Sequence, residues 1–212
     1  MACGSHYERE AFESGYERVA GLDEAGRGCL FGPVYAAAVI LDPARPIRGL
    51  NDSKQVAAAK REQLSVMIRE RAIAWAVASV EAAEIDRINI YQASRLAMRL
   101  AVERLAPQPD YLLIDALRID TRVPQLAIIH GDARCRSIAA ASILAKVERD
   151  ASMAAWHEMY PVYGFLEHKG YATPRHLEAL VRHGATRHHR YSYSPVQAVA
   201  AADPQVALFT EA

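Results

Sequence analysis

The sequence has few cysteines, no long apolar run and no net charge, and each of these absences narrows what the protein can be. Its 212 residues include three cysteines, Cys3, Cys29 and Cys135, whose spacing shows no pairs. This pattern predicts free thiols in a reducing compartment and no zinc site. No apolar stretch approaches the length of a membrane span, and the first residues lack a signal-peptide apolar region. We therefore expect a cytoplasmic protein.

The charge balance excludes a strongly basic surface over the whole chain, because 25 basic residues face 25 acidic ones. Arginine and histidine nevertheless concentrate between residues 168 and 190, where five of the eight histidines lie. Half of the residues are apolar, which is enough for a full core. We expect a disordered lead-in over residues 1–16, one domain over residues 17–196 and a flexible tail over residues 197–212.

The apolar runs and the turn-forming residues between them predict an α/β protein with a mixed β-sheet flanked by helices and a small helical C-terminal extension. The expected strands are residues 17–23, 34–41, 72–80, 111–114 and 126–129. The short gap between the first two strands favours an antiparallel pair. The expected helices are one capped by Asp52 or Ser53, then residues 85–105, 138–147 and 174–184, with a loop over 160–173.

Acidic residues follow the expected strands at three places. Asp23 and Glu24 follow the first strand, Asp115 follows the fourth, and Asp132 lies just past the fifth. If the strand ends share one edge of the sheet, these four carboxylates converge. Like charges raise one another's pKa, and Mg²⁺ or Mn²⁺ relieves the repulsion because hard cations choose oxygen ligands. Two such ions would serve phosphodiester hydrolysis.

Each acid also has an ordinary structural explanation, which the sequence leaves open. Asp115 would end its strand with an Asx-turn, and Asp132 would cap the Ala-rich helix that follows. For the first strand, the alternative is a strand-to-strand turn with solvated charges. Four acids at strand ends are harder to explain in this way together than singly.

The segment 23–28, Asp-Glu-Ala-Gly-Arg-Gly, resembles the N-terminal signature of type 2 ribonucleases H, specifically ribonuclease HII. The resemblance continues in order through residues 51–54, through Asp132 with the Ala-rich run 138–147, and through 163–173 to the closing segment 189–196. Phe31-Gly32-Pro33 is similar to the sister type, ribonuclease HIII, whereas Gly26-Arg27-Gly28 favours HII.

The resemblance implies a ribonuclease H-like fold and endonucleolytic cleavage of RNA paired with DNA. It also implies incision beside a single ribonucleotide embedded in duplex DNA. On the family pattern, Asp23, Glu24, Asp115 and Asp132 bind the two divalent metal ions, and a 3′-hydroxyl and a 5′-phosphate remain after cleavage.

Substrate recognition is implied for a second group of residues. On the family pattern, Gly26, Arg27 and Gly28 recognise the ribose 2′-hydroxyl largely through their backbone, and Tyr171 stacks on the following sugar. The 2′-hydroxyl is the group by which a protein distinguishes RNA from DNA, and a glycine turn lets backbone approach it.

This sequence departs from the family pattern at three places. Cys29-Leu30-Phe31 replaces the commoner Pro-Leu-Ala, and Ala116 follows Asp115 where glycine is usual. Tyr191 and Tyr193 replace the usual arginine and phenylalanine, a change that the sequence does not explain. The alternatives to a ribonuclease are an inactive hybrid-binding protein on the same fold and another two-metal nuclease of the superfamily.

Two further interactions are expected. Lys54, Lys146 and Lys169 are candidates for backbone phosphate contacts, although Lys146 equally fits a solvated helix end. The tail carries Gln205, Leu208 and Phe209, which resemble the Gln-x-x-Leu-Phe peptide that docks bacterial repair proteins on the sliding clamp. The alternative for Leu208 and Phe209 is packing back onto the domain. We expect a monomer.

Overall fold

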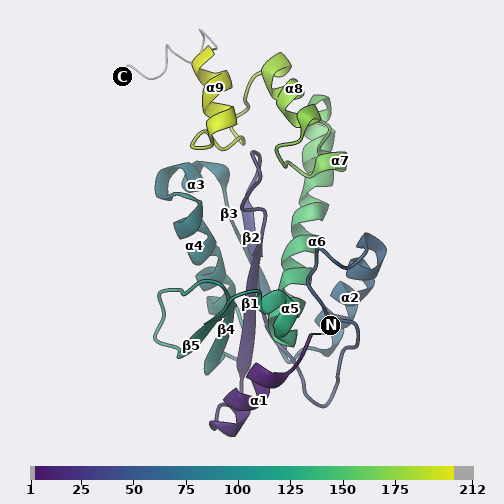
Figure 1. Ribbon diagram of the computed structural model, residues 1–212, viewed down its shortest axis with the longest axis vertical. Helices are drawn as coiled ribbons and strands as arrows, with labels where there is room; N and C mark the ends of the chain where they lie inside the picture. Colours follow the sequence, from purple (N-terminus) through teal and green to yellow (C-terminus); the bar gives the residue numbers. More distant parts are fainter. Residues whose placement is uncertain (1–2, 203–212) are drawn as a thin grey trace. The chain divides into compact units, whose positions relative to one another are not determined.

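Five strands form one mixed sheet in the order β3-β2-β1-β4-β5 (Figure 1). Their bounds are β1 Val19–Ala25, β2 Val34–Ile40, β3 Ala74–Val80, β4 Tyr111–Asp115 and β5 Gln125–Ile128. The expected antiparallel pair of β1 and β2 is confirmed, with Leu22 opposite Ala38. β1 pairs with β4 in parallel, and β4 pairs with β5 in parallel. The central strand therefore has a neighbour of each kind, as a mixed sheet requires.

The computed structural model describes residues 3–202, which divide into two compact units. The first unit contains residues 3–25, 35–79 and 94–148, and it holds most of the sheet. The second contains residues 26–34, 80–93 and 149–202. The single catalytic domain expected over residues 17–196 thus consists of two units, and the chain passes from one to the other directly after β1.

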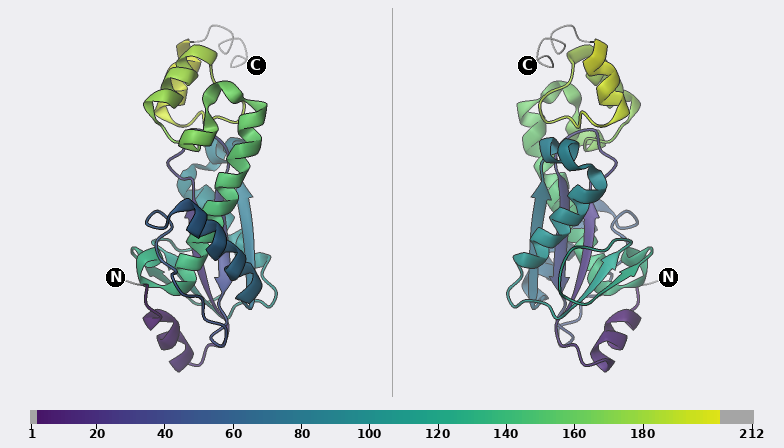
Figure 2. Two further views of the ribbon diagram at one scale, coloured as in Figure 1. Left: turned by 90° about the vertical axis from the view of Figure 1, so that its right-hand side faces the viewer. Right: turned by 90° about the vertical axis from the view of Figure 1, so that its left-hand side faces the viewer.

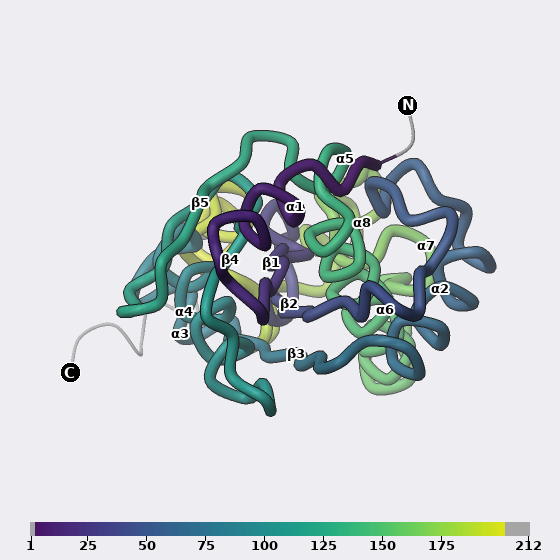
Figure 3. Tube along the Cα trace, turned by 90° about the horizontal axis from the view of Figure 1, so that it is seen from below, coloured from purple at the N-terminus to yellow at the C-terminus, as the bar shows by residue number. Residues whose placement is uncertain are grey.

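In the first unit, small residues let the long helix α6 approach the sheet closely. The helices that lie wholly or mostly in this unit are α1 His6–Glu13, α2 Ala58–Arg71, α4 Ile90–Glu103, α5 Gly131–Arg134 and α6 Arg136–Met159. Fully buried alanines of α6 between residues 139 and 145 pack with Ala37 and Val39 of β2 and with Leu64 and Ile68 of α2. α2 and α6 lie side by side on one face of the sheet (Figure 2). α4 covers the opposite face (Figure 3).

The second unit is built around Phe31. Its own elements are α3 Ala82–Ile88, the 3₁₀ helix η1 Pro161–Tyr163, α7 Phe165–His168, α8 Pro174–His183 and α9 Ser194–Ala202. Phe31 is fully buried, and its ring centroid lies 4.1 Å from that of Phe165 and 5.5 Å from that of Trp156. The unusual phenylalanine at this position is therefore a core residue of the second unit.

Two sequence-based expectations near the ends of the chain were wrong. The lead-in expected to be disordered contains α1, because Glu8 is buried and accepts hydrogen bonds from the backbone N–H of Ser137 (2.8 Å) and its hydroxyl (3.0 Å). The flexible tail was placed from residue 197, but α9 continues to Ala202.

Three helix boundaries also differ from expectation. The single helix expected over residues 85–105 is two helices, because Asn89 adopts φ 68° and its Oδ1 accepts the N–H of Gln92 at 3.1 Å. The expected cap of α2 at Asp52 or Ser53 is wrong, since the helix begins after Ala57 without a side-chain cap. The loop expected over 160–173 contains η1 and α7. No helix within residues 3–202 is both long and apolar enough to cross a membrane.

Candidate active site

The acidic residues Asp23 and Asp115 come from neighbouring parallel strands of the first unit. Leu22 of β1 pairs with Ile114 of β4, so Asp23 and Asp115 are each the next residue along strands that run in the same direction. Both strands therefore present a carboxylate at the same end of the sheet, where α/β proteins hold their reactive groups. Glu24 follows Asp23 within β1, where it lies opposite Ala36.

Asp132 reaches the same region through the short helix α5 after β5. The N–H of Gly131 donates to Oδ1 of Asp115 at 2.7 Å, so the loop that carries Asp132 is tied to the end of β4. His130 precedes it with φ 56°, which turns the chain from β5 into α5. Asp132 itself is buried, with an exposed fraction of 7 %.

The electrostatics show that the structure brings these acids together. Burial raises the pKa of Asp23 well above its usual value, and the charges of Glu24 and Asp115 raise it further. Burial also raises the pKa of Asp132, and Asp52 and Asp115 add to that increase. The charge of Asp115 thus disfavours the ionised forms of both Asp23 and Asp132.

Asp52, Ser53 and Ser142 belong to this region, although the sequence analysis assigned them no functional role. Asp52 acts on Asp132, as described above, and Lys54 contacts Asp132 with 3.8 Å between Nζ and Oδ2. The buried hydroxyls of Ser53 and Ser142 are hydrogen-bonded at 2.9 Å, and a hydrogen bond with Ser142 opposes the increase in the pKa of Asp23. The feature of the sequence that could have indicated this role is Ser142, a serine inside the otherwise apolar run of α6.

The donor set of the first unit fits a hard divalent cation. Its groups are carboxylate oxygens, and burial and neighbouring carboxylates raise the pKa values of Asp23 and Asp132, which the charge of a bound cation would oppose. Among residues 3–202, no three acidic, histidine or cysteine side chains lie close enough to form a ready-made ligand set.

The second unit contains the glycine turn. Gly26 has φ 96°, and a Cβ at this position would lie 2.1 Å from Nε of Arg149, so only glycine lets the buried guanidinium lie against the turn. The N–H of Cys29 donates to the carbonyl of Gly26 at 3.4 Å and closes the turn. Gly28 is exposed, with open space around it.

Tyr171 lies next to this turn within the second unit. It forms an antiparallel bridge with Cys29, and the Arg149 guanidinium lies 5.6 Å from the centroid of its ring. Nη2 of Arg149 donates to the carbonyl of Lys169 at 2.8 Å. Tyr171 as a residue remains 38 % exposed, so the structure brings the turn and an accessible aromatic residue together.

Comparison with known proteins identifies the family. The family model described as Ribonuclease HII matches residues 20–196. The chain is 57 % identical over 196 residues to a ribonuclease HII of Solibacter usitatus, covering 92 % of this chain and 86 % of that protein. It is 54 % identical over 180 residues to one of Idiomarina loihiensis, covering 84 % and 96 %. The chain belongs to the ribonuclease HII family. It is an endoribonuclease of the ribonuclease H class, and the family cleaves RNA in RNA–DNA hybrids.

Solved structures agree with this assignment. The ribonuclease H2 of Pyrococcus horikoshii matches with a TM-score of 0.73 and 25 % identity, over 86 % of this chain and 97 % of that one. Bst-RNase HIII in complex with Mn²⁺ matches with a TM-score of 0.70 at 20 % identity, over 92 % and 73 %, which supports the fold alone. The expected ribonuclease H-like fold is confirmed.

The three candidate lysines of this ribonuclease HII have different environments. The carboxylates of Asp132 and Asp52 raise the pKa of Lys54 against the opposing effect of burial, and its side chain is 79 % exposed. Lys146 is partly buried on α6. Lys169 caps α7 in a left-handed conformation with φ 50°. The tail residues Gln205, Leu208 and Phe209 lie outside the described residues.

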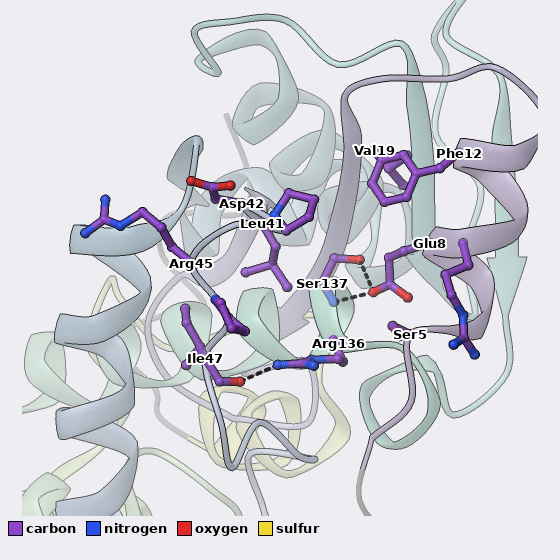
Figure 4. A pocket seen from close by; sticks show the side chains of 13 residues that line it. Ser5, Glu8, Phe12, Val19, Leu41, Asp42, Arg45, Ile47, Arg136 and Ser137 are labelled. Atoms are coloured by element: carbon purple, nitrogen blue, oxygen red, sulfur yellow. Dashed lines mark hydrogen bonds between the residues drawn. The ribbon is translucent and has the colours of Figure 1, made fainter.

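A separate pocket of about 260 Å³ opens in the first unit (Figure 4). Apolar side chains such as Phe12 and Val19 line it together with Glu8 and Arg136. Glu8 points toward Ser137 and binds it there, as described for α1 (Figure 4). The four acids are absent from its lining, so this pocket is not the candidate active site.

Proposed function

We propose that this ribonuclease HII cleaves the RNA strand of RNA–DNA hybrids and incises duplex DNA on the 5′ side of a single embedded ribonucleotide. The observation that carries the proposal is the pair Asp23 and Asp115, each one residue beyond the Leu22–Ile114 pair of adjacent parallel strands. The charge of Asp115 raises the pKa of Asp23, so these carboxylates interact.

Asp23, Glu24, Asp115 and Asp132 would hold two Mg²⁺ or Mn²⁺ ions. The ions would supply activation of the attacking water and stabilisation of the leaving oxygen, which leaves a 3′-hydroxyl and a 5′-phosphate. The Mn²⁺ complex of Bst-RNase HIII supports a divalent cofactor for this fold. Because Asp115 also accepts the Gly131 N–H, one of its oxygens is already oriented before a cation binds.

Gly26, Arg27 and Gly28 would recognise the ribose 2′-hydroxyl through backbone groups, and Tyr171 would stack on the next sugar. Two observations support this: Gly28 is exposed with open space around it, and Tyr171 is tied to Cys29, the residue after the turn. Reading the 2′-hydroxyl is the chemical requirement for telling a ribonucleotide from a deoxynucleotide.

Lys54, Lys146 and Lys169 would hold backbone phosphates, which position a substrate without specifying its sequence. Lys54 is the best supported of the three, because its exposed amine lies beside Asp132. We propose that the enzyme acts as a monomer in the cytoplasm, where the thiols of Cys3, Cys29 and Cys135 stay reduced; all three are free in the structure.

The test is cleavage of a DNA duplex containing one ribonucleotide, with Mg²⁺ or Mn²⁺, by the parent, Asp23→Asn and Asp115→Asn. Asp120→Asn is the matched control, because it makes the same charge change at an exposed carboxylate five residues after Asp115. We expect each site variant to lose more than about 100-fold in rate while duplex binding survives.

The outcomes separate the alternatives. A parent that binds the duplex without cutting it would be an inactive hybrid-binding protein. A parent that cuts all-DNA duplexes equally well would be another nuclease of the superfamily. Parental rates in Asp23→Asn would refute the assignment of the acids.

A sliding-clamp partner through Gln205, Leu208 and Phe209 is a separate part of the proposal. Leu208 and Phe209 are apolar anchors for a pocket, and a tether would raise the local concentration of enzyme on DNA. A solved complex of PCNA with RNase HII from Archaeoglobus fulgidus, 26 % identical with a TM-score of 0.73 over 85 % of this chain and 96 % of that one, supports a clamp partner. The test compares clamp binding by the full chain and by a version ending at Pro204, and equal binding would refute the role of the tail.

A further inference from the structure

The carbonyl of Arg27, in the middle of the glycine turn, accepts two hydrogen bonds from the C-terminal part of the second unit. Nη1 of Arg190 donates to it at 2.9 Å, and the hydroxyl of Tyr193 donates to it as well. Arg190 and Tyr193 also bind each other, with 3.2 Å between Nη1 and the hydroxyl oxygen. These three groups form a closed ring of hydrogen bonds on one backbone carbonyl.

Arg190 is fixed by further contacts with the segment that follows the turn. Its Nε donates to the carbonyl of Gly32 at 3.0 Å, and its backbone N–H donates to the carbonyl of Leu30 at 2.8 Å. Its guanidinium carbon lies 5.4 Å from the ring centroid of Tyr193. Arg190 therefore donates hydrogen bonds to three carbonyls of the segment from Arg27 to Gly32.

Burying an arginine in this way costs free energy of folding unless other groups compensate its charge and its donors. Arg190 has no measurable exposure, and within residues 3–202 no carboxylate lies within 4.0 Å of its guanidinium and Nη2 has no hydrogen-bond partner. A buried, uncompensated guanidinium is destabilising. The carbonyls of the turn segment are its main compensation, so the burial of Arg190 is coupled to the geometry of the turn.

Fixing the Arg27 carbonyl also fixes the next N–H. The peptide bond between Arg27 and Gly28 is planar, so in its trans form the Gly28 N–H points away from the Arg27 carbonyl. That carbonyl points toward the buried Arg190, whereas Gly28 is exposed. Among the described residues the Gly28 N–H makes no hydrogen bond. Its donor is thus available to a ligand.

We propose that Arg190 and Tyr193 are positioning residues that aim the Gly28 N–H at the ribose 2′-hydroxyl of the substrate. Neither side chain touches the substrate in this role; both act through the Arg27–Gly28 peptide. The inference rests on the proposed function of the glycine turn and assigns its orientation to two residues 163 and 166 positions further along the chain.

The experiment compares Tyr193→Phe with Tyr191→Phe. The first removes the hydroxyl on the Arg27 carbonyl and keeps the ring. The second removes a hydroxyl from the same segment that donates to the carbonyl of Ala185 at 3.4 Å, away from the turn. Affinity is measured without divalent ions for a duplex with one ribonucleotide and for the same duplex in all-DNA form. The ratio of the two affinities reports 2′-hydroxyl discrimination.

We expect Tyr193→Phe to lower this ratio about threefold to tenfold, with unchanged affinity for the all-DNA duplex. The Arg27 carbonyl loses one of its two side-chain donors, and Arg190 loses its hydrogen bond to the hydroxyl. Tyr191→Phe should keep the parental ratio. The affinity ratio of Arg190→Lys should lie between those of the parent and Arg190→Gln, because the lysine ammonium group can still donate to the Arg27 carbonyl. Melting temperatures of all variants report any loss of folding.

The results separate the two proposals. A parental ratio in Tyr193→Phe, or an equal loss of affinity for both duplexes, would overturn the positioning role alone. A parent that does not discriminate between the duplexes would overturn the proposed function of the turn, and the positioning role with it.

Discussion

A chain of buried histidines makes a pH dependence predictable. His176 and His189 have no measurable exposure, and their Nε2 atoms lie 3.3 Å apart. Nδ1 of His176 contacts the carbonyl of Tyr171 at 2.9 Å, and Nδ1 of His189 accepts the N–H of Thr186 at 3.0 Å. This row of hydrogen bonds therefore runs from Thr186 to the backbone of Tyr171, the proposed sugar-stacking residue.

These contacts require both rings to be neutral. His189 accepts at Nδ1, so its proton is on Nε2 and points at His176. His176 donates from Nδ1 to a carbonyl, so its Nε2 is free to accept that proton. Protonating His176 would put two N–H groups face to face, and protonating His189 would oppose its Nδ1 to the N–H of Thr186.

The sign of the pH effect follows from the direction of the pKa shifts. Burial lowers the pKa of His176 from 6.5 to about 4 and that of His189 from 6.5 to about 3. Between about pH 6.5 and 4 the unfolded chain therefore binds more protons than the folded one. The free energy of unfolding therefore decreases as the pH is lowered through this range, by up to about 1.4 kcal/mol per pH unit for each histidine. Above about pH 7 these two residues contribute no pH dependence.

The assay is urea unfolding of the parent and of His189→Gln at pH 7.5, 6.0 and 5.0. Glutamine places an amide near the position of Nε2 and does not titrate, so the variant should lose stability more slowly between pH 7 and 5 than the parent. His6→Gln is the control, because His6 is exposed, and its contacts are with Glu10 and Tyr7 of its own helix. Equal slopes for the parent and His189→Gln would refute the neutral histidine chain.

Four further outcomes are expected. Asp23→Asn should lose cleavage yet melt at or above the parental temperature without divalent ions, because its burial beside Glu24 and Asp115 no longer involves a charge. Tyr171→Ala should reduce junction preference by about 1–3 kcal/mol with normal affinity for all-DNA duplex, and a large drop in melting temperature with normal preference would contradict this. Gly21→Ala should destabilise strongly in thermal melts, because its Cβ would lie 2.1 Å from a backbone carbon of α6. Ala116→Gly should raise the melting temperature, because Ala116 has φ 49° and a left-handed alanine costs about 1–2 kcal/mol.

The sheet and the acids could be predicted because their signals are local. The strands are mostly apolar runs, and β1 and β4 carry acidic residues at or near their ends, as in Tyr111–Asp115. The pairing of β1 with β4 then brings Asp23 and Asp115 to one place without any further information.

The helix boundaries that were predicted wrongly depend either on contacts with distant residues or on the backbone conformation of a single residue. α1 is held by Glu8 bonding to Ser137, at a separation of 129 residues, which no pattern within residues 1–16 indicates. The break at Asn89 depends on one residue with positive φ in a segment that otherwise has helical periodicity. Ala116 shows the reverse case: its departure from glycine was visible in the sequence, and the structure shows that its cost is a left-handed backbone.

Tyr193 illustrates why the groups that orient a site are harder to find than the groups that perform its chemistry. A carboxylate can be recognised by its type and its place after a strand. The hydroxyl of Tyr193 acts only because the chain brings it to the carbonyl of Arg27, beside a buried arginine that already binds there. Substituting phenylalanine would leave the ring and its packing against the Arg190 guanidinium in place and remove only the hydroxyl, which donates to the carbonyl of Arg27 and accepts from Nη1 of Arg190. A change that small is nearly silent for folding, so it reaches function only through the direction in which the Gly28 N–H points.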